Sequence, residues 1–254
     1  MKLGFIGSGE ITKAVVQGIT KSQINYKKIL ISKRNNKISS YLKKINKKVR
    51  ISSDNQHIID NSDWIFLAIT PTVAKQILEK LKFKDKQIVI SFISTIKLRE
   101  LKLLSNKKTN IVRAIPLPPI SFMKGPIPLF PRNKKVSKFF NNIGDTIEIS
   151  DETTSLSFWA VSSLMAPYYE LLNEVSMWLQ KKGLNKWHAQ KYVVSLFSAL
   201  SDAAVIRSNK DLKFLVETSQ TPKGLNEQTL KYLKKKGFYK QLNVSLEKIF
   251  KRLK

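Results

Sequence analysis

The chain of 254 residues contains no cysteine. Without thiols, disulfide frameworks, zinc fingers, catalytic thiolates and iron–sulfur clusters are all excluded. Histidine is nearly as scarce, because only His57 and His188 occur. We expect His57 in a loop-to-helix segment and His188 on a lysine-rich helix, both as surface or structural residues. No grouping of Asp, Glu and His has the spacing of a metal site, so we expect no metal.

Acidic residues are also few, with 18 Asp and Glu against 46 Lys and Arg, a formal net charge of +28. Such an excess is typical of proteins that bind nucleic acid or an anionic membrane. The lysines, however, are scattered over nearly every predicted helix and loop, without interleaved aromatic residues. This pattern favours solvated faces, or a charge-assisted pocket for an anionic small molecule, over specific nucleic-acid binding.

One segment lacks basic residues altogether. Between Lys138 and Lys181 there is no Lys or Arg, although several carboxylates occur there. The gap predicts a buried or packed region. Within this segment, Leu156–Leu172 is apolar enough for a transmembrane helix to be considered. Its serines, Pro167 and Glu170 favour instead a helix buried between subunits.

The first residues run directly into a glycine turn and lack the basic and apolar regions of a signal peptide. We therefore expect a cytoplasmic protein. The composition, 42% hydrophobic and 25% charged, is that of an ordinary globular chain.

Short apolar runs alternate with amphipathic stretches through the first half of the chain. This alternation predicts βαβ units and a doubly wound, Rossmann-like parallel sheet covered on both faces. The predicted strands are Lys2–Gly7, Ile29–Ser32, Trp64–Ala68, Ile88–Phe92 and Asn110–Ala114, with peripheral strands at Ile127–Phe130 and Thr146–Ile149. The predicted helices are Glu10–Thr20, Lys37–Lys44, Val73–Leu81, Leu98–Leu104 and one near Lys134–Asn141.

After Ile149 the pattern becomes helical, and Asp151–Thr154 offers several N-caps. Pro167 should kink or split the first long helix. We therefore predict a nucleotide-type domain over residues 1–150 and an all-helical dimerisation and substrate domain over residues 151–254. The predicted helices of the second domain are Ser155–Leu179, Lys186–Ser208, Asp211–Glu217, Pro222–Lys235 and Phe238–Leu253.

The segment Gly4-Phe5-Ile6-Gly7-Ser8-Gly9 joins the first strand to the first helix. Gly7 permits the tight turn, and Gly9 lets the backbone approach a pyrophosphate. The start of the helix supplies N–H donors and positive potential. Thr12 stands where the dinucleotide fingerprint has Gly or Ala. An ordinary strand–turn–helix glycine pair is the alternative interpretation.

The second strand ends in Ser32-Lys33-Arg34. An NAD site would have Asp or Glu there to accept from the ribose 2′-hydroxyl. A hydroxyl and two cations suit a 2′-phosphate instead, which predicts NADP. The alternative is that Lys33 and Arg34 are two more surface charges.

These motifs, followed by Ser53-Asp54-Asn55, Phe66–Pro71 and Arg113-Ala114-Ile115-Pro116, resemble the pyrroline-5-carboxylate reductase family. The resemblance implies that Asn55 contacts the cofactor and that Ala68–Pro71 lies on its nicotinamide side. The cofactor-binding residues are thus predicted to be Gly7, Ser8, Gly9, Glu10, Ile11, Ser32, Lys33, Arg34, Asn55, Ala68, Thr70 and Pro71.

The substrate side departs from the family. Its Ser-Pro-Gly-Gly-Thr-Thr loop is replaced by Thr218–Glu227, and its Met-Pro-Asn-Thr-Pro segment by Ile115–Pro119. Thr221 is predicted to be an N-cap with Pro222 at the first helical position, so that the helix points free N–H groups at a carboxylate. A cap without a ligand is the alternative. The predicted substrate-binding residues are Thr218, Ser219, Thr221 and Gly224.

Three functions remain open. The first, implied by the resemblance, is an NADPH-dependent reductase of proline-biosynthetic type that delivers hydride to the C=N bond of a small cyclic imino acid. Thr221 is the predicted catalytic residue, and Tyr168 and Tyr169 are the other proton-donor candidates or packing residues. The second is a non-catalytic NADP-binding or regulatory paralogue that has lost its substrate loop. The third is a nucleic-acid-associated basic protein. We expect a homodimer or larger assembly, no membrane and no specific nucleic acid.

Overall fold

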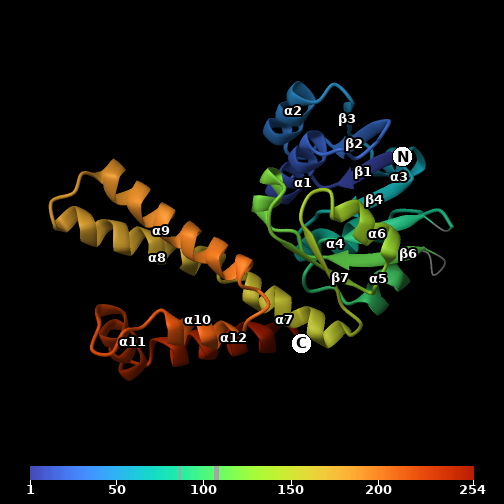
Figure 1. The fold of residues 1–254 in the computed structure, drawn as a ribbon. Coiled ribbons are helices and arrows are strands. Elements are labelled where there is room, and N and C mark those ends of the chain that lie inside the picture. Colours follow the sequence, from blue (N-terminus) through green and yellow to red (C-terminus); the bar gives the residue numbers. More distant parts are fainter. Residues whose placement is uncertain (86, 106–108) are drawn as a thin grey trace. The chain divides into compact units, whose positions relative to one another are not determined.

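The computed structural model describes residues 1–85, 87–105 and 109–254 (Figure 1). It divides into two compact units, residues 1–159 together with 253–254, and residues 160–252. The division falls within one helix, α7 (Glu152–Ser162), whose start lies close to the predicted domain boundary near residue 150.

An eight-stranded sheet forms the centre of the first unit, in the order β3-β2-β1-β4-β5-β6-β7-β8. Every pair of neighbours is parallel except β6 and β7. The predicted Rossmann-like sheet is therefore confirmed. The strands are β1 (Lys2–Ile6), β2 (Lys28–Ser32), β3 (Val49–Ser52), β4 (Trp64–Leu67), β5 (Ile88–Ser91), β6 (Asn110–Ala114), β7 (Pro126–Phe130) and β8 (Asp145–Glu148).

Strand β3 was not predicted from the sequence. It is four residues long, lies at the edge of the sheet and buries only Val49 fully, so its hydrophobic signal is weak. Its register is fixed by pairing with β2, where Ser32 lies opposite Ser52. The loop after β3 thereby comes beside the end of β2.

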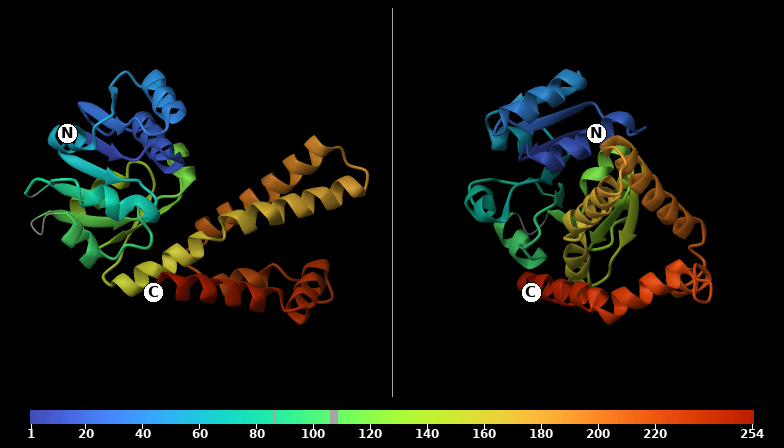
Figure 2. Two further views of the ribbon diagram at one scale, coloured as in Figure 1. Left: turned by 180° about the vertical axis from the view of Figure 1, so that it is seen from behind. Right: turned by 90° about the vertical axis from the view of Figure 1, so that its left-hand side faces the viewer.

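Alternate side chains of each central strand enter two separate hydrophobic clusters, one on each face. On β1, Phe5 belongs to one cluster and Ile6 to the other. The first cluster is covered by α1 (Glu10–Lys21), α2 (Asn36–Ile45), the 3-10 helix η1 (Pro118–Phe122) and α6 (Lys134–Phe140). The second is covered by α3 (Asn55–Asp60), α4 (Pro71–Leu78) and α5 (Leu98–Leu104) (Figures 1 and 2).

One strand carries a buried charge. Arg113 on β6 is 2% exposed, and its guanidinium lies 2.7 Å from Glu152 Oε1 at the start of α7. A second nitrogen of Arg113 donates to the carbonyl of Ser94 at 2.6 Å, while Nε has no partner. Burial lowers the pKa of Arg113, and the Glu152 carboxylate partly opposes that change. The pair joins the sheet to the first turn of α7.

The second unit is helical. It continues from α7 through α8 (Met165–Lys181), α9 (Lys186–Ile206), α10 (Leu212–Thr218), α11 (Leu225–Lys235) and α12 (Phe238–Leu253). The predicted helix Ser155–Leu179 is split at Ser163–Leu164, so that Pro167 lies in the first turn of α8, where its missing N–H breaks no bond. Of the helices described, none combines the length and the hydropathy that a bilayer-spanning segment requires.

The start of α11 corrects a prediction. Gly224, not Thr221, is the N-cap, and the helix begins at Leu225 instead of Pro222. The Gly224 N–H donates to the Thr221 carbonyl at 2.8 Å, and Lys223 has φ of 63°. Proline at the second position and positive φ at the third are typical of a type II turn. This turn delays the helix by three residues.

Candidate functional site

The glycine turn after β1 has the geometry that its sequence predicts. Gly7 has φ of +107°, and a Cβ there would lie 2.1 Å from the Ala68 carbonyl oxygen. Gly9 is the N-cap of α1, and a Cβ built on it would meet no protein atom within 4 Å. Gly7 is therefore required by the fold, whereas Gly9 leaves open space beside the start of a helix.

The first turn of α1 is suited to an anion. No side chain caps its N-terminus, so its N–H groups are left to solvent or a ligand. Thr12, at the third fingerprint position, is fully buried, and its Oγ1 donates to the Gly7 carbonyl at 2.8 Å. This departure from Gly or Ala thus stabilises the turn.

Two hydrogen bonds join the glycine turn to the end of β2. The Gly7 N–H donates to Ser32 Oγ at 3.0 Å, and the Asn35 N–H donates to Ser8 Oγ at 2.8 Å. Asn35 in turn caps α2, because its Oδ1 accepts from the Ile38 N–H at 3.1 Å. The turn and the β2–α2 loop therefore form one connected structure.

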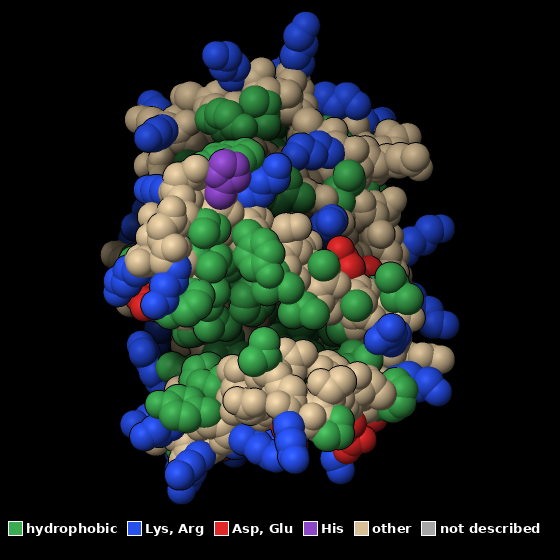
Figure 3. Space-filling view, turned by 60° about the vertical axis from the view of Figure 1, so that its left-hand side comes forward, with side chains coloured by type: hydrophobic (Ala, Val, Ile, Leu, Met, Phe, Trp, Pro, Cys, Tyr) green, Lys and Arg blue, Asp and Glu red, His purple; other side chains and the backbone are tan. Residues whose placement is uncertain are grey.

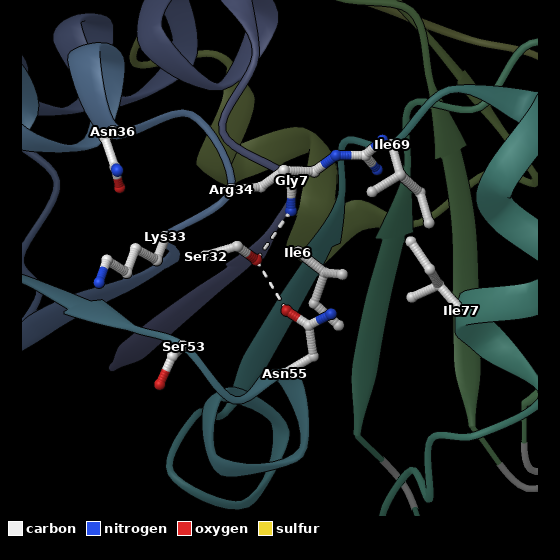
Figure 4. A pocket seen from close by; sticks show the side chains of 10 residues that line it. All are labelled: Ile6, Gly7, Ser32, Lys33, Arg34, Asn36, Ser53, Asn55, Ile69 and Ile77. Atoms are coloured by element: carbon white, nitrogen blue, oxygen red, sulfur yellow. Dashed lines mark hydrogen bonds between the residues drawn. The ribbon is translucent and has the colours of Figure 1, made fainter.

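A cleft of about 380 Å³ opens beside this structure at the carboxyl ends of the strands. A smaller one of about 240 Å³ adjoins it over the glycine turn. Arg34 borders both, and its side chain extends toward Ile69 while that of Lys33 extends the other way (Figure 4). The larger cleft is lined by Ile6, Gly7, Ser32, Lys33, Arg34, Asn36, Ser53, Asn55, Ile69 and Ile77, and the smaller by Gly7, Ser8, Gly9, Arg34, Asn35, Ala68, Ile69 and Thr70.

The cleft is cationic. Lys33 and Arg34 are both exposed, and none of the described residues that line the two clefts is Asp or Glu. A ribose 2′-hydroxyl would therefore meet no carboxylate acceptor here, whereas a phosphate would meet a guanidinium and an ammonium group.

Most of the predicted cofactor residues line the clefts. The exceptions are Glu10 and Ile11 in the first turn of α1 and Pro71 at the start of α4. Sequence reasoning missed Asn35, Asn36 and Ser53. Asn35 and Asn36 directly follow Arg34, so their position was a usable signal. Ser53 belongs to the Ser53-Asp54-Asn55 motif, but without a predicted strand β3 its position beside the end of β2 was not evident.

The predicted substrate residues lie in the second unit, around the end of α10. Thr218 Oγ1 donates to the Phe214 carbonyl at 2.8 Å, and Ser219 Oγ to that of Val216 at 3.0 Å. A Cβ on Gly224 would lie 2.2 Å from Thr221 Oγ1. The hydroxyls of Thr218 and Ser219 are thus directed at their own helix, and any contact of these residues with a substrate stays a prediction.

A carboxylate of the chain itself already lies at the start of α11. Glu227 accepts from the Lys223 N–H at 2.6 Å and pairs with Lys231 at 2.6 Å. The bond from Lys231 and that from the Lys223 N–H lower the pKa of Glu227. A substrate carboxylate at this helix start would have to compete with Glu227.

The tyrosine candidates lie on α8. Tyr168 and Tyr169 are 42% and 55% exposed, with ring centroids 5.7 Å apart, and Tyr168 packs edge-on against Phe197 of α9. Within the described residues, no three His, Asp or Glu side chains gather in the manner of a metal site.

Comparison with known proteins agrees with this geometry. Residues 2–95 match the family model described as NADP oxidoreductase coenzyme F420-dependent. Pyrroline-5-carboxylate reductase 2 of Bacillus subtilis is 24% identical over 99% of this chain and 93% of its own length. The structure of the pyrroline-5-carboxylate reductase from Streptococcus pyogenes superposes with a TM-score of 0.85 at 20% identity, covering 100% of this chain and 98% of that one.

The chain is similar over nearly its whole length to pyrroline-5-carboxylate reductases and shares their fold. The Plasmodium falciparum pyrroline carboxylate reductase, whose structure has NADP bound, gives a TM-score of 0.84 at 21% identity, with 100% of this chain and 97% of that chain covered. The similarity to these reductases spans both units.

Proposed function

We propose that this protein is an NADPH-dependent reductase that transfers hydride to the C=N bond of a small cyclic imino acid. The observation that carries the proposal is the cleft at Gly7, Gly9 and Arg34, which joins an uncapped helix start to a cationic rim without carboxylates. The relatives that cover nearly the whole chain are named for reduction of pyrroline-5-carboxylate.

The residues present fit a dinucleotide phosphate. The open space at Gly9 leaves room for a pyrophosphate against the N–H groups of α1. Arg34 is proposed to bind the 2′-phosphate, with Lys33 adding positive potential at the rim, and Asn55 lines the same cleft. Ala68, Thr70 and Pro71, after β4, are proposed to lie on the nicotinamide side.

When bound, NADPH would supply the hydride for the imine carbon. The protein must then hold the substrate carboxylate, exclude water and let a proton reach the nitrogen. We propose that Thr218, Ser219, Thr221 and Gly224 bind the carboxylate, with Thr221 nearest the reaction. The products would be the cyclic amino acid and NADP⁺.

We further propose that the functional molecule is at least a homodimer, formed through the helical unit. Large apolar side chains are exposed along α8 and α9, among them Trp178, Trp187, Val194 and Leu200. Figure 3 shows a broad hydrophobic area bordered by Lys and Arg side chains. A further cleft of about 590 Å³ between α8 and α12 is lined mainly by apolar groups. A second copy would cover such surfaces. The proposed compartment is the cytoplasm, which holds a pool of reduced nicotinamide nucleotide.

The decisive experiment follows NADPH oxidation by absorbance with pyrroline-5-carboxylate, other cyclic imino acids and 2-oxo acids. Turnover with a cyclic imino acid is expected. Tight NADPH binding without turnover on any of these compounds would contradict catalysis and favour the regulatory paralogue. Absence of nucleotide binding would contradict the proposal as a whole.

A further inference from the structure

The end of β2 holds a serine whose hydroxyl is already engaged within the protein. Ser32 is 6% exposed. Its Oγ accepts from the Gly7 N–H at 3.0 Å, and lies 2.8 Å from Asn55 Oδ1 and 3.2 Å from the Phe5 carbonyl (Figure 4). A serine hydroxyl has a single hydrogen to donate. Because both other neighbours are acceptors, that hydrogen is directed into the protein.

We propose that Ser32 is a positioning residue of the nucleotide site, acting through Gly7 and Asn55, and that it does not bind the 2′-phosphate. The inference rests on the proposed function. It replaces the sequence-based expectation that Ser32 and Arg34 share one phosphate. A phosphate oxygen needs a donor, and Ser32 has no second hydrogen to give.

The first link is the glycine turn. Gly7 has a positive φ and packs so closely against the end of β4 that a Cβ on it would lie 2.1 Å from the Ala68 carbonyl oxygen. Ser32 supplies the acceptor for the Gly7 N–H from a strand 25 residues away. Without the hydroxyl, a buried N–H would lose its partner, and the turn would relax to find water. The pyrophosphate-binding backbone would lose its fixed geometry.

The second link is the amide of Asn55 at the first position of α3. Because the Ser32 hydroxyl occupies Oδ1, the other end of the amide, Nδ2, is left as a donor for the cleft that Asn55 lines. Asp54 fixes the same turn by accepting from the Gln56 N–H at 2.8 Å. Ser32 thus orients the glycine turn and the Asn55 amide, which on this proposal contact the parts of the nucleotide common to NADPH and NADH.

The two candidate roles of Ser32 therefore predict different ratios of NADPH affinity to NADH affinity in a Ser32 variant. A 2′-phosphate contact affects NADPH alone. A positioning role weakens both nucleotides by the same factor and leaves their preference unchanged. Arg34, which ends in the open cleft, provides the contrasting case.

The experiment is fluorescence titration of NADPH and NADH on the full chain and on Ser32→Ala, Asn55→Ala, the double variant and Arg34→Ala. Ser32→Ala is expected to weaken both nucleotides about tenfold, the effect of one lost buried hydrogen bond. The double variant should lose less than the product of the two single effects, because the residues act through one network. Ser32→Thr should restore most of the lost affinity.

A matched control is Ser91→Ala. Ser91 also ends a strand, is fully buried and accepts a backbone N–H, that of Ile93 at 3.3 Å, but lines neither cleft. This variant should lower the melting temperature without changing either affinity. In the nucleotide-free protein, hydrogen exchange at the Gly7 amide should quicken in Ser32→Ala and not in Ser91→Ala.

A loss confined to NADPH would overturn the inference by making Ser32 a phosphate ligand. Unchanged affinities with a lowered melting temperature would overturn it by making Ser32 merely structural. If Ser32→Ala does not fold, Asn55→Ala tests the same inference, because it should weaken NADPH and NADH by the same factor. A wild-type chain that binds neither nucleotide would refute the proposed function, and the inference with it.

Discussion

At the scale of single residues, we expect nucleotide choice to depend on the two cations that follow β2. Arg34 borders both parts of the cleft, and no carboxylate of the described lining residues opposes a phosphate there. Each charge-assisted hydrogen bond to a 2′-phosphate would contribute about 1.5–3 kcal/mol, less an allowance for exposure and salt. The side chain of Lys33 points away from that of Arg34, so Arg34 is the residue expected to discriminate.

We expect the wild-type protein to bind NADPH about ten- to a hundredfold more tightly than NADH. Arg34→Ala should remove most of this preference by weakening NADPH while changing NADH little. Calorimetric titration of both nucleotides at fixed ionic strength, on the wild type and on Arg34→Ala, measures this preference as a ratio of dissociation constants. Equal wild-type affinities would show that Ser32-Lys33-Arg34 carries only surface charge.

Thr221 tests the substrate loop at the same scale. If its hydroxyl binds the substrate carboxylate, Thr221→Val should lower kcat/KM about tenfold or more and leave NADPH affinity nearly unchanged. Thr229→Val, on an exposed position of α11, is the matched control and should have no effect. Wild-type kinetics in a folded Thr221→Val variant would exclude the role given to this residue.

At the scale of elements, the Arg113–Glu152 pair connects β6 to the first turn of α7. Glu152 Oε1 also accepts from the Leu98 N–H at 2.7 Å, so one carboxylate joins β6, α5 and α7. Removing a partner from a buried pair leaves an uncompensated charge, which costs more than the pair itself contributes. Glu152 is 26% exposed at its side chain, which moderates the cost.

Glu152→Gln should therefore lower the free energy of unfolding by about 2–4 kcal/mol, measured by urea denaturation. Joint replacement by Arg113→Met and Glu152→Leu should recover part of the loss, because no buried charge remains. Glu217→Gln, which breaks the exposed pair with Lys213, should be silent. An equally silent Glu152→Gln would show that water solvates Arg113.

At the scale of the whole molecule, the helical unit exposes more apolar surface than a monomer commonly tolerates. Exposed large apolar side chains recur along α9, where Trp187, Val194 and Leu200 are each more than half exposed. No Lys or Arg occurs between Lys138 and Lys181, so no basic side chain interrupts the apolar surface of α8 before its last residue. Both facts support a self-association surface.

The full chain should sediment as a dimer or larger species at micromolar concentration, and a chain ending at Trp159, which keeps Glu152, as a folded monomer. Val194→Glu should shift the full chain toward monomer, whereas Lys191→Glu, which also adds a negative charge on α9, should do so far less. A monomeric full-length protein would refute the interface.

The sequence by itself determined the parallel sheet, the position of the glycine turn and the splitting of the long helix just before Pro167. These depend on local properties: the alternation of side chains along a strand, the φ that only glycine adopts easily at Gly7, and the N–H that proline lacks. The absence of Asp or Glu after β2 could also be recognised from the sequence, because it depends only on which residues follow the strand.

Only the tertiary structure decided the rest. Strand β3 exists because β2 pairs with it, and α11 begins at Leu225 because the Thr221–Gly224 turn closes first. The hydroxyl of Ser32 turns inward because Gly7 and Asn55, 25 and 23 residues away, meet it there. Which atom a polar side chain bonds is set by neighbours that folding brings together, and no local pattern in the chain encodes them.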